Sequence, residues 1–206
     1  MEAFFVSIGT IALAELGDKT MLLALALAAR YRAPLQIILG ILIATLANHA
    51  LAGALGAWVQ DAVPPDVLRY IVGGVFIALG LWMLIPDKPT ARTFGEDLGP
   101  LIATIISFFI AEMGDKTQIA TLALASHSYS LLLVIIGTTI GMLIVNIPVV
   151  YLGNFASTYL PLGLIRGLAV AVFIIIGALI LSGVGVGLMP ESAPPPSEAA
   201  PEPTGS

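Results

Sequence analysis

The chain has 206 residues, of which 58% are hydrophobic and only 10% are charged, and its mean hydropathy is +1.03. These values lie far from those of a soluble domain and indicate an integral membrane protein. Cysteine is absent, which excludes disulfides and thiolate metal sites and leaves oxygen and imidazole as metal ligands. The net charge of −5 at pH 7 provides no basic face, so nucleic acid is excluded as a partner.

Six apolar runs are long enough to cross a bilayer as helices, which takes about 20 residues each. The first run lacks the basic lead-in and the small-residue cleavage site of a secretory signal, so we interpret it as a mature helix. We therefore predict an all-α integral membrane fold with six transmembrane helices. The runs cover residues 3–29, 35–59, 67–86, 99–126, 131–153 and 164–188.

The sequence contains an internal repeat with an offset of 97 residues. This shift places AELGDKT (14–20) on AEMGDKT (111–117), and it also matches Pro64 to Pro161. Each copy holds three predicted crossings, an odd number, so the second copy must enter the membrane from the opposite side. We predict two inverted three-helix repeats, the arrangement typical of many secondary transporters. A duplicated scaffold without a transport role is the alternative, but it need not keep charges at the bilayer centre. The predicted units are a first repeat (1–86), a cytoplasmic linker (87–98), a second repeat (99–188) and a disordered acidic, proline-rich tail (189–206).

The basic residues predict the orientation of the helices in the membrane. By the positive-inside rule, the loops after the first, third and fifth predicted helices are cytoplasmic and both termini lie outside the cytoplasm. In a bacterial-type chain this is the inner (plasma) membrane. Arg69, alone on the opposite side, and Arg166 are expected to reach opposite membrane interfaces. The cytoplasmic loops carry Arg30, Arg32, Lys88, Arg92 and Arg166.

Each repeat carries two acids and one lysine inside its first apolar run. Insertion scales place the cost of each Asp or Lys at a helix centre at about 2.5–3.5 kcal/mol. On a regular helix Glu15, Asp18 and Lys19 are spaced i, i+3 and i+4 and share one face. Glu112, Asp115 and Lys116 repeat this pattern in the second copy.

An ion pair within each helix, helping the bundle to pack, would be the simplest role for these charges. However, each repeat has one negative charge in excess. If the two clusters meet, four carboxylates and two ammonium groups form a site of about −2 that needs a divalent cation or two protons. We therefore predict that a metal ion and protons compete for the carboxylates, with Lys19 and Lys116 balancing charge. This competition is the physical basis of antiport.

Three polar residues of the run 35–59, Thr45, Asn48 and His49, share one helical face, and the 97-residue shift carries His49 onto Asn146. Asn48, His49 and Asn146 are either additional metal ligands or interhelical hydrogen-bonding groups. Oxygen ligands suit Ca²⁺ and Mn²⁺. An imidazole ligand would favour Mn²⁺ over Ca²⁺.

Gly17 and Gly114 separate the two acids of each copy. Either they let the helix unwind, as in other carriers with broken helices, or they allow close helix packing. Thr20 and Thr117 point off the acid face of a regular helix and would join the site only if the helix unwinds. Gln118 aligns with an apolar methionine, so any role for Gln118 breaks the symmetry of the repeat.

Small residues recur at equivalent places in the second helix of each repeat. Gly40 with Ala44, and Gly137 with Gly141, form small-xxx-small pairs. Such pairs let helix backbones approach closely. We interpret them as packing contacts.

The doubled Glu-x-Gly-Asp-Lys-Thr motif, here ELGDKT and EMGDKT, resembles the signature of a cation/proton antiporter family that includes Golgi and chloroplast manganese and calcium transporters and bacterial manganese exporters. The resemblance extends to about residue 188. It implies that Glu15, Asp18, Glu112 and Asp115 belong to the cation site, that Mn²⁺ or Ca²⁺ is exchanged for H⁺, and that Mn²⁺ leaves the cytoplasm. The expected partners are a divalent metal ion, H⁺ and the lipid bilayer, with no cofactor other than the transported ion; a homo-oligomer is left open.

Two other classes of function deserve comparison. An intramembrane enzyme with a reacting carboxylate pair would not place Lys19 and Lys116 beside its acids, because the ammonium groups would hold both acids ionised. An exporter of small organic cations or amino acids would need an aromatic-lined pocket, and Tyr and Trp are sparse here. The sequence therefore favours a transporter of a bare ion rather than an enzyme.

Overall fold

The computed structural model describes residues 2–85, 93–128, 130–152 and 162–183. The predicted tail (189–206) and the first part of the linker (87–98) lie outside these residues. Within them the chain forms eight α-helices and one short 3₁₀ helix, without a strand, which confirms the all-α prediction. The helices are α1 (Glu2–Glu15), α2 (Lys19–Tyr31), α3 (Pro34–Ala62), α4 (Pro65–Trp82), η1 (Glu96–Leu98), α5 (Gly99–Glu112), α6 (Lys116–Ser126), α7 (Leu131–Leu152) and α9 (Leu162–Leu181).

Among the described residues, three helices are both long enough and apolar enough to cross a membrane by themselves: α3, α4 and α7. The segments Gly99–Glu112 and Arg166–Leu181 are apolar but shorter. The protein is thus a helical membrane protein. Pro34 and Pro65 stand in the first turns of α3 and α4, where the missing amide hydrogen of proline costs nothing.

The predicted runs 3–29 and 99–126 are not continuous helices, so of the two alternatives left open for Gly17 and Gly114 the structure shows the unwound one. The first run breaks between α1 and α2 and the second breaks between α5 and α6, in each case at the charged motif. The three charges of one motif therefore do not share a helical face. Instead, a turn separates the two acids of each motif. The glutamate ends one helix, and the aspartate precedes the next.

Each helix of the second half begins 97 residues after its counterpart in the first half. The starting residues pair as 2 with 99, 19 with 116, 34 with 131 and 65 with 162. The sequence repeat is thus also a repeat of local structure, including the break in the charged motif.

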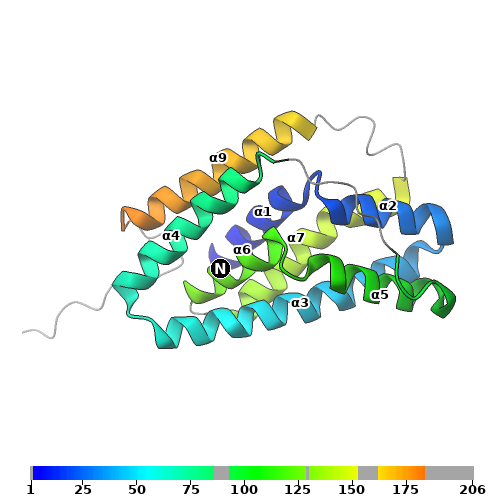
Figure 1. Cartoon of the computed structure of the whole chain (residues 1–206), viewed down its shortest axis with the longest axis horizontal. Helices are drawn as coiled ribbons and strands as arrows, with labels where there is room; N and C mark the ends of the chain where they lie inside the picture. The colour runs from blue at the N-terminus through cyan, green and yellow to red at the C-terminus, as the bar shows by residue number, and fades with distance from the viewer. Residues whose placement is uncertain (1, 86–92, 129, 153–161, 184–206) are drawn as a thin grey trace, which may run out of the picture.

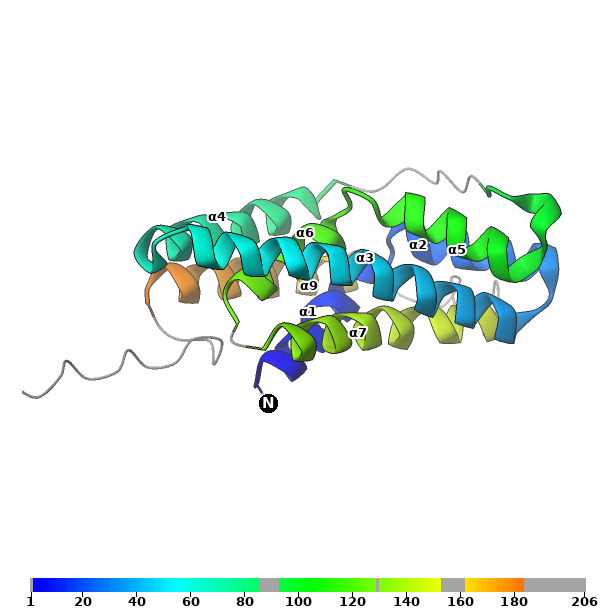
Figure 2. The same cartoon turned by 90° about the horizontal axis from the view of Figure 1, so that it is seen from below.

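Helices from the two halves pack against each other in reciprocal pairs. Figure 1 shows α4 and α9 side by side along one flank, and Figure 2 shows α3 running the length of the molecule. The ring of Phe76 in α4 packs at a tilt against that of Phe173 in α9, with ring centroids 5.6 Å apart, and these two residues are equivalent in the repeat. The contact therefore joins one position to its own counterpart.

Gly40 and Gly137, from the two small-xxx-small pairs, make equivalent close contacts with the backbone of a neighbouring helix. A methyl group on Gly40 of α3 would lie 3.0 Å from the Leu101 carbonyl oxygen of α5. A methyl group on Gly137 of α7 would lie 2.7 Å from the Phe4 carbonyl oxygen of α1. Leu101 is the counterpart of Phe4, so α3 packs on α5 as α7 packs on α1. The predicted packing role of these glycines is confirmed.

Two apolar clusters form the core, and each broken helix contributes one half to each cluster. Ile11 of α1 and Leu124 of α6 lie in the first cluster, together with Phe76 and Phe173. Met21 and Leu27 of α2 and Phe108 of α5 lie in the second cluster. The breaks, with their charged residues, therefore lie at the boundary between the two clusters.

We predict that Gly137→Ala destabilises the protein. The new methyl group would meet the backbone of α1 and force α1 and α7 apart, which costs about 1–3 kcal/mol. Gly9→Ala is the matched control because nothing lies within 4 Å of a methyl group there. It should leave stability unchanged or raise it slightly. Thermal unfolding of the purified protein in detergent, followed by circular dichroism, tests both variants. Equal melting temperatures for the two would contradict the packing assignment.

Candidate functional site

The two charged motifs adopt the same turn. Met113 has φ −62° and ψ 117°, and Gly114 has φ 73°, which are the angles of a type II turn with glycine at its third position. Gly17 likewise has φ 83°. In both copies the aspartate N–H donates to the glutamate carbonyl oxygen three residues earlier, at 3.0 Å. Only glycine adopts this positive φ without strain, so the glycines unwind the helix rather than tighten its packing.

The turn places each acid at a helix end. Glu15 and Glu112 are the last residues of α1 and α5, where carboxylates add to the negative ends of the helix dipoles. Asp18 and Asp115 occupy the N-cap positions of α2 and α6, but neither side chain caps its helix with a hydrogen bond. All four carboxylates thus lie at the helix breaks, beside the negative ends of α1 and α5 and the positive ends of α2 and α6.

The threonines join the acids, as the sequence predicted for an unwound helix. The Thr20 hydroxyl donates to Glu15 Oε1 in a short hydrogen bond and lies 3.4 Å from Asp18 Oδ2. In the second copy the Thr117 hydroxyl donates to Glu112 Oε2 at 2.7 Å and lies 3.5 Å from an Asp115 oxygen. Each threonine thus lies between the two acids of its own motif.

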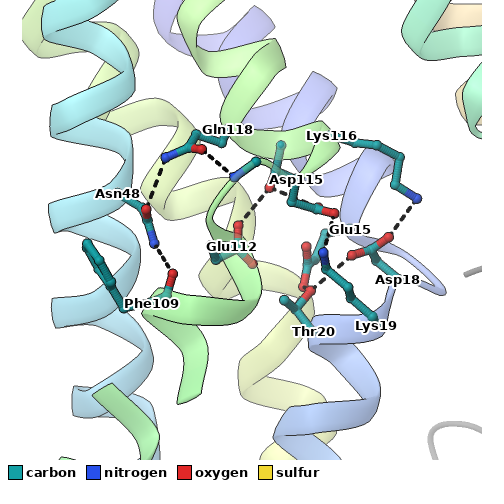
Figure 3. Close-up of polar contacts among 12 residues, drawn as sticks. Glu15, Asp18, Lys19, Thr20, Asn48, Phe109, Glu112, Asp115, Lys116 and Gln118 are labelled. Carbon is teal, nitrogen blue, oxygen red and sulfur yellow. Dashed lines mark hydrogen bonds and ion pairs between the residues drawn. The ribbon is translucent and has the colours of Figure 1, made fainter. Parts of the chain in front are cut away.

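The lysines bridge the two halves of the chain. Lys19 Nζ lies 2.7 Å from Asp115 Oδ1, and Lys116 Nζ lies 2.7 Å from Asp18 Oδ1. Figure 3 shows these crossed ion pairs joining the start of α2 to the start of α6. The charged motifs therefore form one cluster, whereas an ion pair confined to each motif is not what the structure shows.

The carboxylates of the cluster are almost fully enclosed. Glu15 and Glu112 are 0% exposed. One oxygen of each, Glu15 Oε2 and Glu112 Oε1, has no hydrogen-bond partner among the described residues. Burying an ionised carboxylate without full compensation is costly. The two glutamates are therefore strong acceptors for a cation or a proton.

The two helices that flank the motifs differ in what they offer. Asn146 of α7 donates to Glu15 Oε1 at 2.9 Å. Its counterpart, His49 of α3, is fully buried, and neither ring nitrogen has a hydrogen-bond partner among the described residues. Thr45, one turn earlier on α3, is also buried. Of the predicted additional ligands Asn48, His49 and Asn146, only Asn146 forms a hydrogen bond with an acid of the motifs within the described part of the chain.

Asn48 and Gln118 contact each other rather than the carboxylates. Asn48 donates to the Phe109 carbonyl oxygen near the end of α5 at 3.0 Å, and Gln118 donates to Asn48 Oδ1 at 3.1 Å. The Gly114 N–H donates to Gln118 Oε1 at 2.7 Å. These bonds secure the second turn to α3, and Figure 3 shows them to one side of the acids. At the positions equivalent by the 97-residue shift, Met21 and Val145 replace the two amides, so the network has no counterpart at the first turn.

Arg166 lies closer to the cluster than the sequence suggested. It lines a cavity of about 10 Å³ together with Met83, Ile85, Asp18 and Lys116, and its place at a membrane interface stays a prediction. Such a cavity has room for about one water molecule. Met83 and Ile85 are ordinary apolar residues in sequence, so no local pattern indicates their position beside the motif.

As the side chains lie, the described residues contain no group of three or more acidic or histidine side chains arranged to hold a metal ion. Each aspartate instead faces a lysine of the other half. A cation bound by all four acids would therefore require these side chains to rearrange.

Two helices of this protein are broken at buried charges, and the broken ends meet at one cluster. This arrangement is typical of membrane carriers with discontinuous helices. Comparison with known proteins identifies the family. Residues 3–91 and 100–185 match the family described as "Divalent cation/proton antiporter GDT1". The chain belongs to this family, and it is a transporter rather than an enzyme.

Among curated relatives, a Vibrio cholerae protein named "Putative manganese exporter" is 49% identical over 176 residues, covering 85% of this chain and 88% of the relative. "GDT1-like protein sll0615" of Synechocystis is 28% identical over 150 residues, covering 62% and 72% of the two chains. "GDT1-like protein 3" of Oryza sativa subsp. indica is 29% identical over 154 residues, covering 61% and 54%. No solved structure matches the chain.

We predict that Gly114→Ala damages the site through backbone strain alone. Nothing lies within 4 Å of a methyl group at this position, but the left-handed conformation costs an alanine about 1–2 kcal/mol. Gly74→Ala in α4 is the control, since its added methyl group also meets nothing within 4 Å. Cation binding and thermal unfolding should both weaken in the Gly114 variant and not in the control. A Gly114 variant indistinguishable from the control would refute the need for the turn.

Proposed function

We propose that this protein exchanges a divalent cation, Mn²⁺ in preference to Ca²⁺, for H⁺ and removes Mn²⁺ from the cytoplasm. The observation that carries the proposal is the joining of both charged motifs into one buried cluster by the crossed lysine–aspartate pairs. The site consists of Glu15, Asp18, Glu112 and Asp115, with Thr20 and Thr117 as neighbouring oxygen ligands.

The charge of the cluster supports exchange of a divalent ion for protons. Four ionised carboxylates and two ammonium groups leave a net charge of about −2, and an uncompensated charge is costly in a membrane interior. One divalent cation neutralises it, and so do two protons on the glutamates. The two loaded forms carry the same net charge, so either can persist while the doubly negative form is disfavoured.

The proposed architecture is six crossings in two inverted three-helix repeats. In this arrangement α1 with α2, and α5 with α6, each form one broken crossing, while α3, α4, α7 and α9 form the others. The 97-residue correspondence of helix starts and the contact of Phe76 with its counterpart Phe173 support it. A pseudo-twofold axis would then pass between these rings and through the charged cluster, where the substrates of such carriers bind.

The choice of ion rests on ligand chemistry and on the relatives. The acids, threonines and Asn146 offer oxygen, which suits both Ca²⁺ and Mn²⁺. His49, one position after Asn48, offers an imidazole that has no hydrogen-bond partner in the described ranges, and an imidazole within reach of the ion would favour Mn²⁺. The name of the Vibrio cholerae relative points the same way. Asn48 and Gln118 support the second turn in this proposal rather than bind the ion.

The small space beside the motifs argues against an organic cation or an amino acid as the substrate. The cavity beside Asp18 and Lys116 measures only about 10 Å³. The Asp and Thr side chains contact each other closely, which leaves space for an ion rather than an organic molecule.

The proposed orientation, with both termini outside the cytoplasm in the inner membrane, follows from the basic loops.

We predict that Glu15→Gln and Asp115→Asn each abolish Mn²⁺ uptake driven by a pH gradient in proteoliposomes. Both variants remove a negative charge needed to bind the ion but keep the side-chain shape. Asn146→Asp is a useful companion, because it adds a carboxylate next to Glu15 and should alter the pH dependence of exchange. Retained transport in both Glu15→Gln and Asp115→Asn would refute the site.

The same assay should be run with Mn²⁺, Ca²⁺, Mg²⁺ and a panel of amino acids. We expect Mn²⁺ to be transported most effectively and Mg²⁺ poorly, because Mg²⁺ demands octahedral geometry and gives up water reluctantly. Uptake of an amino acid without a divalent cation would contradict the proposed substrate.

A further inference from the structure

The crossed ion pairs are the main ionic link between the two motifs among the described residues. Each pair joins the first residues of α2 to those of α6, with N–O distances of 2.7 Å. The lysine of one motif thus contacts the aspartate of the other and not its own neighbour. An ion pair of this kind is broken whenever something else takes the aspartate.

We propose that Lys19 and Lys116 are tethered competitors of the transported cation, and that the cation releases the link between the two halves when it displaces them. This inference rests on the proposed function, since it assumes that Asp18 and Asp115 bind the ion. The lysines stay positively charged throughout, and only their partner changes. Occupancy of the site thereby controls a contact between the halves.

The competition follows from the geometry. Each ammonium group occupies the position beside an aspartate oxygen that a metal ion would need. As the described side chains lie, no group of three acids can hold a metal ion. Moving both ammonium groups away adds two carboxylates to the two glutamates, whose free oxygens already lack partners. Four carboxylates then become available to the ion.

The two links differ in access. The side chain of Lys19 is 26% exposed, whereas that of Lys116 is 5% exposed. Met83, Ile85 and Arg166 border the Lys116–Asp18 pair, while Met113, in the turn before Asp115, is 53% exposed. Lys19 is the more accessible of the two lysines, so in this inference the cation displaces the Lys19–Asp115 pair first and the Lys116–Asp18 pair second.

The first test measures Mn²⁺ affinity of the purified full-length protein at a fixed pH, using the electron paramagnetic resonance signal of free Mn²⁺. Lys19→Met removes the competing charge and keeps the apolar stem, so we expect Mn²⁺ to bind about tenfold more tightly or better, with exchange in proteoliposomes lost. Lys19→Arg keeps the competing charge and should bind Mn²⁺ no more tightly than the wild-type protein. Arg32→Gln removes a charge from an exposed position and serves as the matched control.

A second measurement uses the unaltered protein, in case loss of a lysine prevents folding. The chain has only three lysines, Lys19, Lys88 and Lys116, so acetylation of each can be followed by mass spectrometry. Saturating Mn²⁺ should raise the acetylation rate of Lys19 several-fold and that of Lys116 to a smaller extent. Lys88, in the linker, is the internal reference.

The outcomes separate this inference from the proposed function. If wild-type protein binds no Mn²⁺ by the resonance signal and transports none, the proposed function fails. If Mn²⁺ binds and is transported but both motif lysines keep their acetylation rates, the tethered-competitor inference fails by itself. Lys19→Met binding Mn²⁺ as weakly as Lys19→Arg would also overturn it.

Discussion

The structure depends on keeping charged groups inside an apolar bundle. Three charges per motif would cancel most of the insertion energy of the segment that carries them. Crossing the ion pairs between α2 and α6 neutralises two of the four acids and places the rest at the interface of the halves. Because neither motif can satisfy its own charges in this way, each half requires the other. The polar cluster therefore specifies how the halves dock, in addition to its proposed role in transport.

The break in each helix makes this crossing feasible. A type II turn with glycine at positive φ ends one helix at a glutamate and starts the next at an aspartate. The first apolar cluster holds α1 and α6, and the second holds α2 and α5. The site thus lies where two separately packed regions meet. Small changes in how these regions pack would change the distances between the acids, which suits a carrier that must bind and release an ion.

The two halves are similar but not equivalent. The Asn146 side-chain amide donates a hydrogen bond to Glu15, whereas the side chain of the equivalent His49 makes no hydrogen bond among the described residues. The Asn48–Gln118 network secures only the second turn. The two motifs therefore have identical charged residues but different surroundings.

The sequence by itself determined the all-helical membrane class, the 97-residue repeat and the identity of the acidic residues, because hydropathy, exact repetition of a polar motif and charge cost are local properties. It also predicted that the threonines would reach the acids if the helix unwound. It could not decide between unwinding and continuous helix, since a glycine is compatible with both. Only the tertiary structure decided that Lys19 pairs with Asp115 rather than Asp18, that Gln118 binds Asn48, and that Arg166 lies beside the motif. Such choices depend on which helices of the two halves pack together, and no spacing within one helix records that.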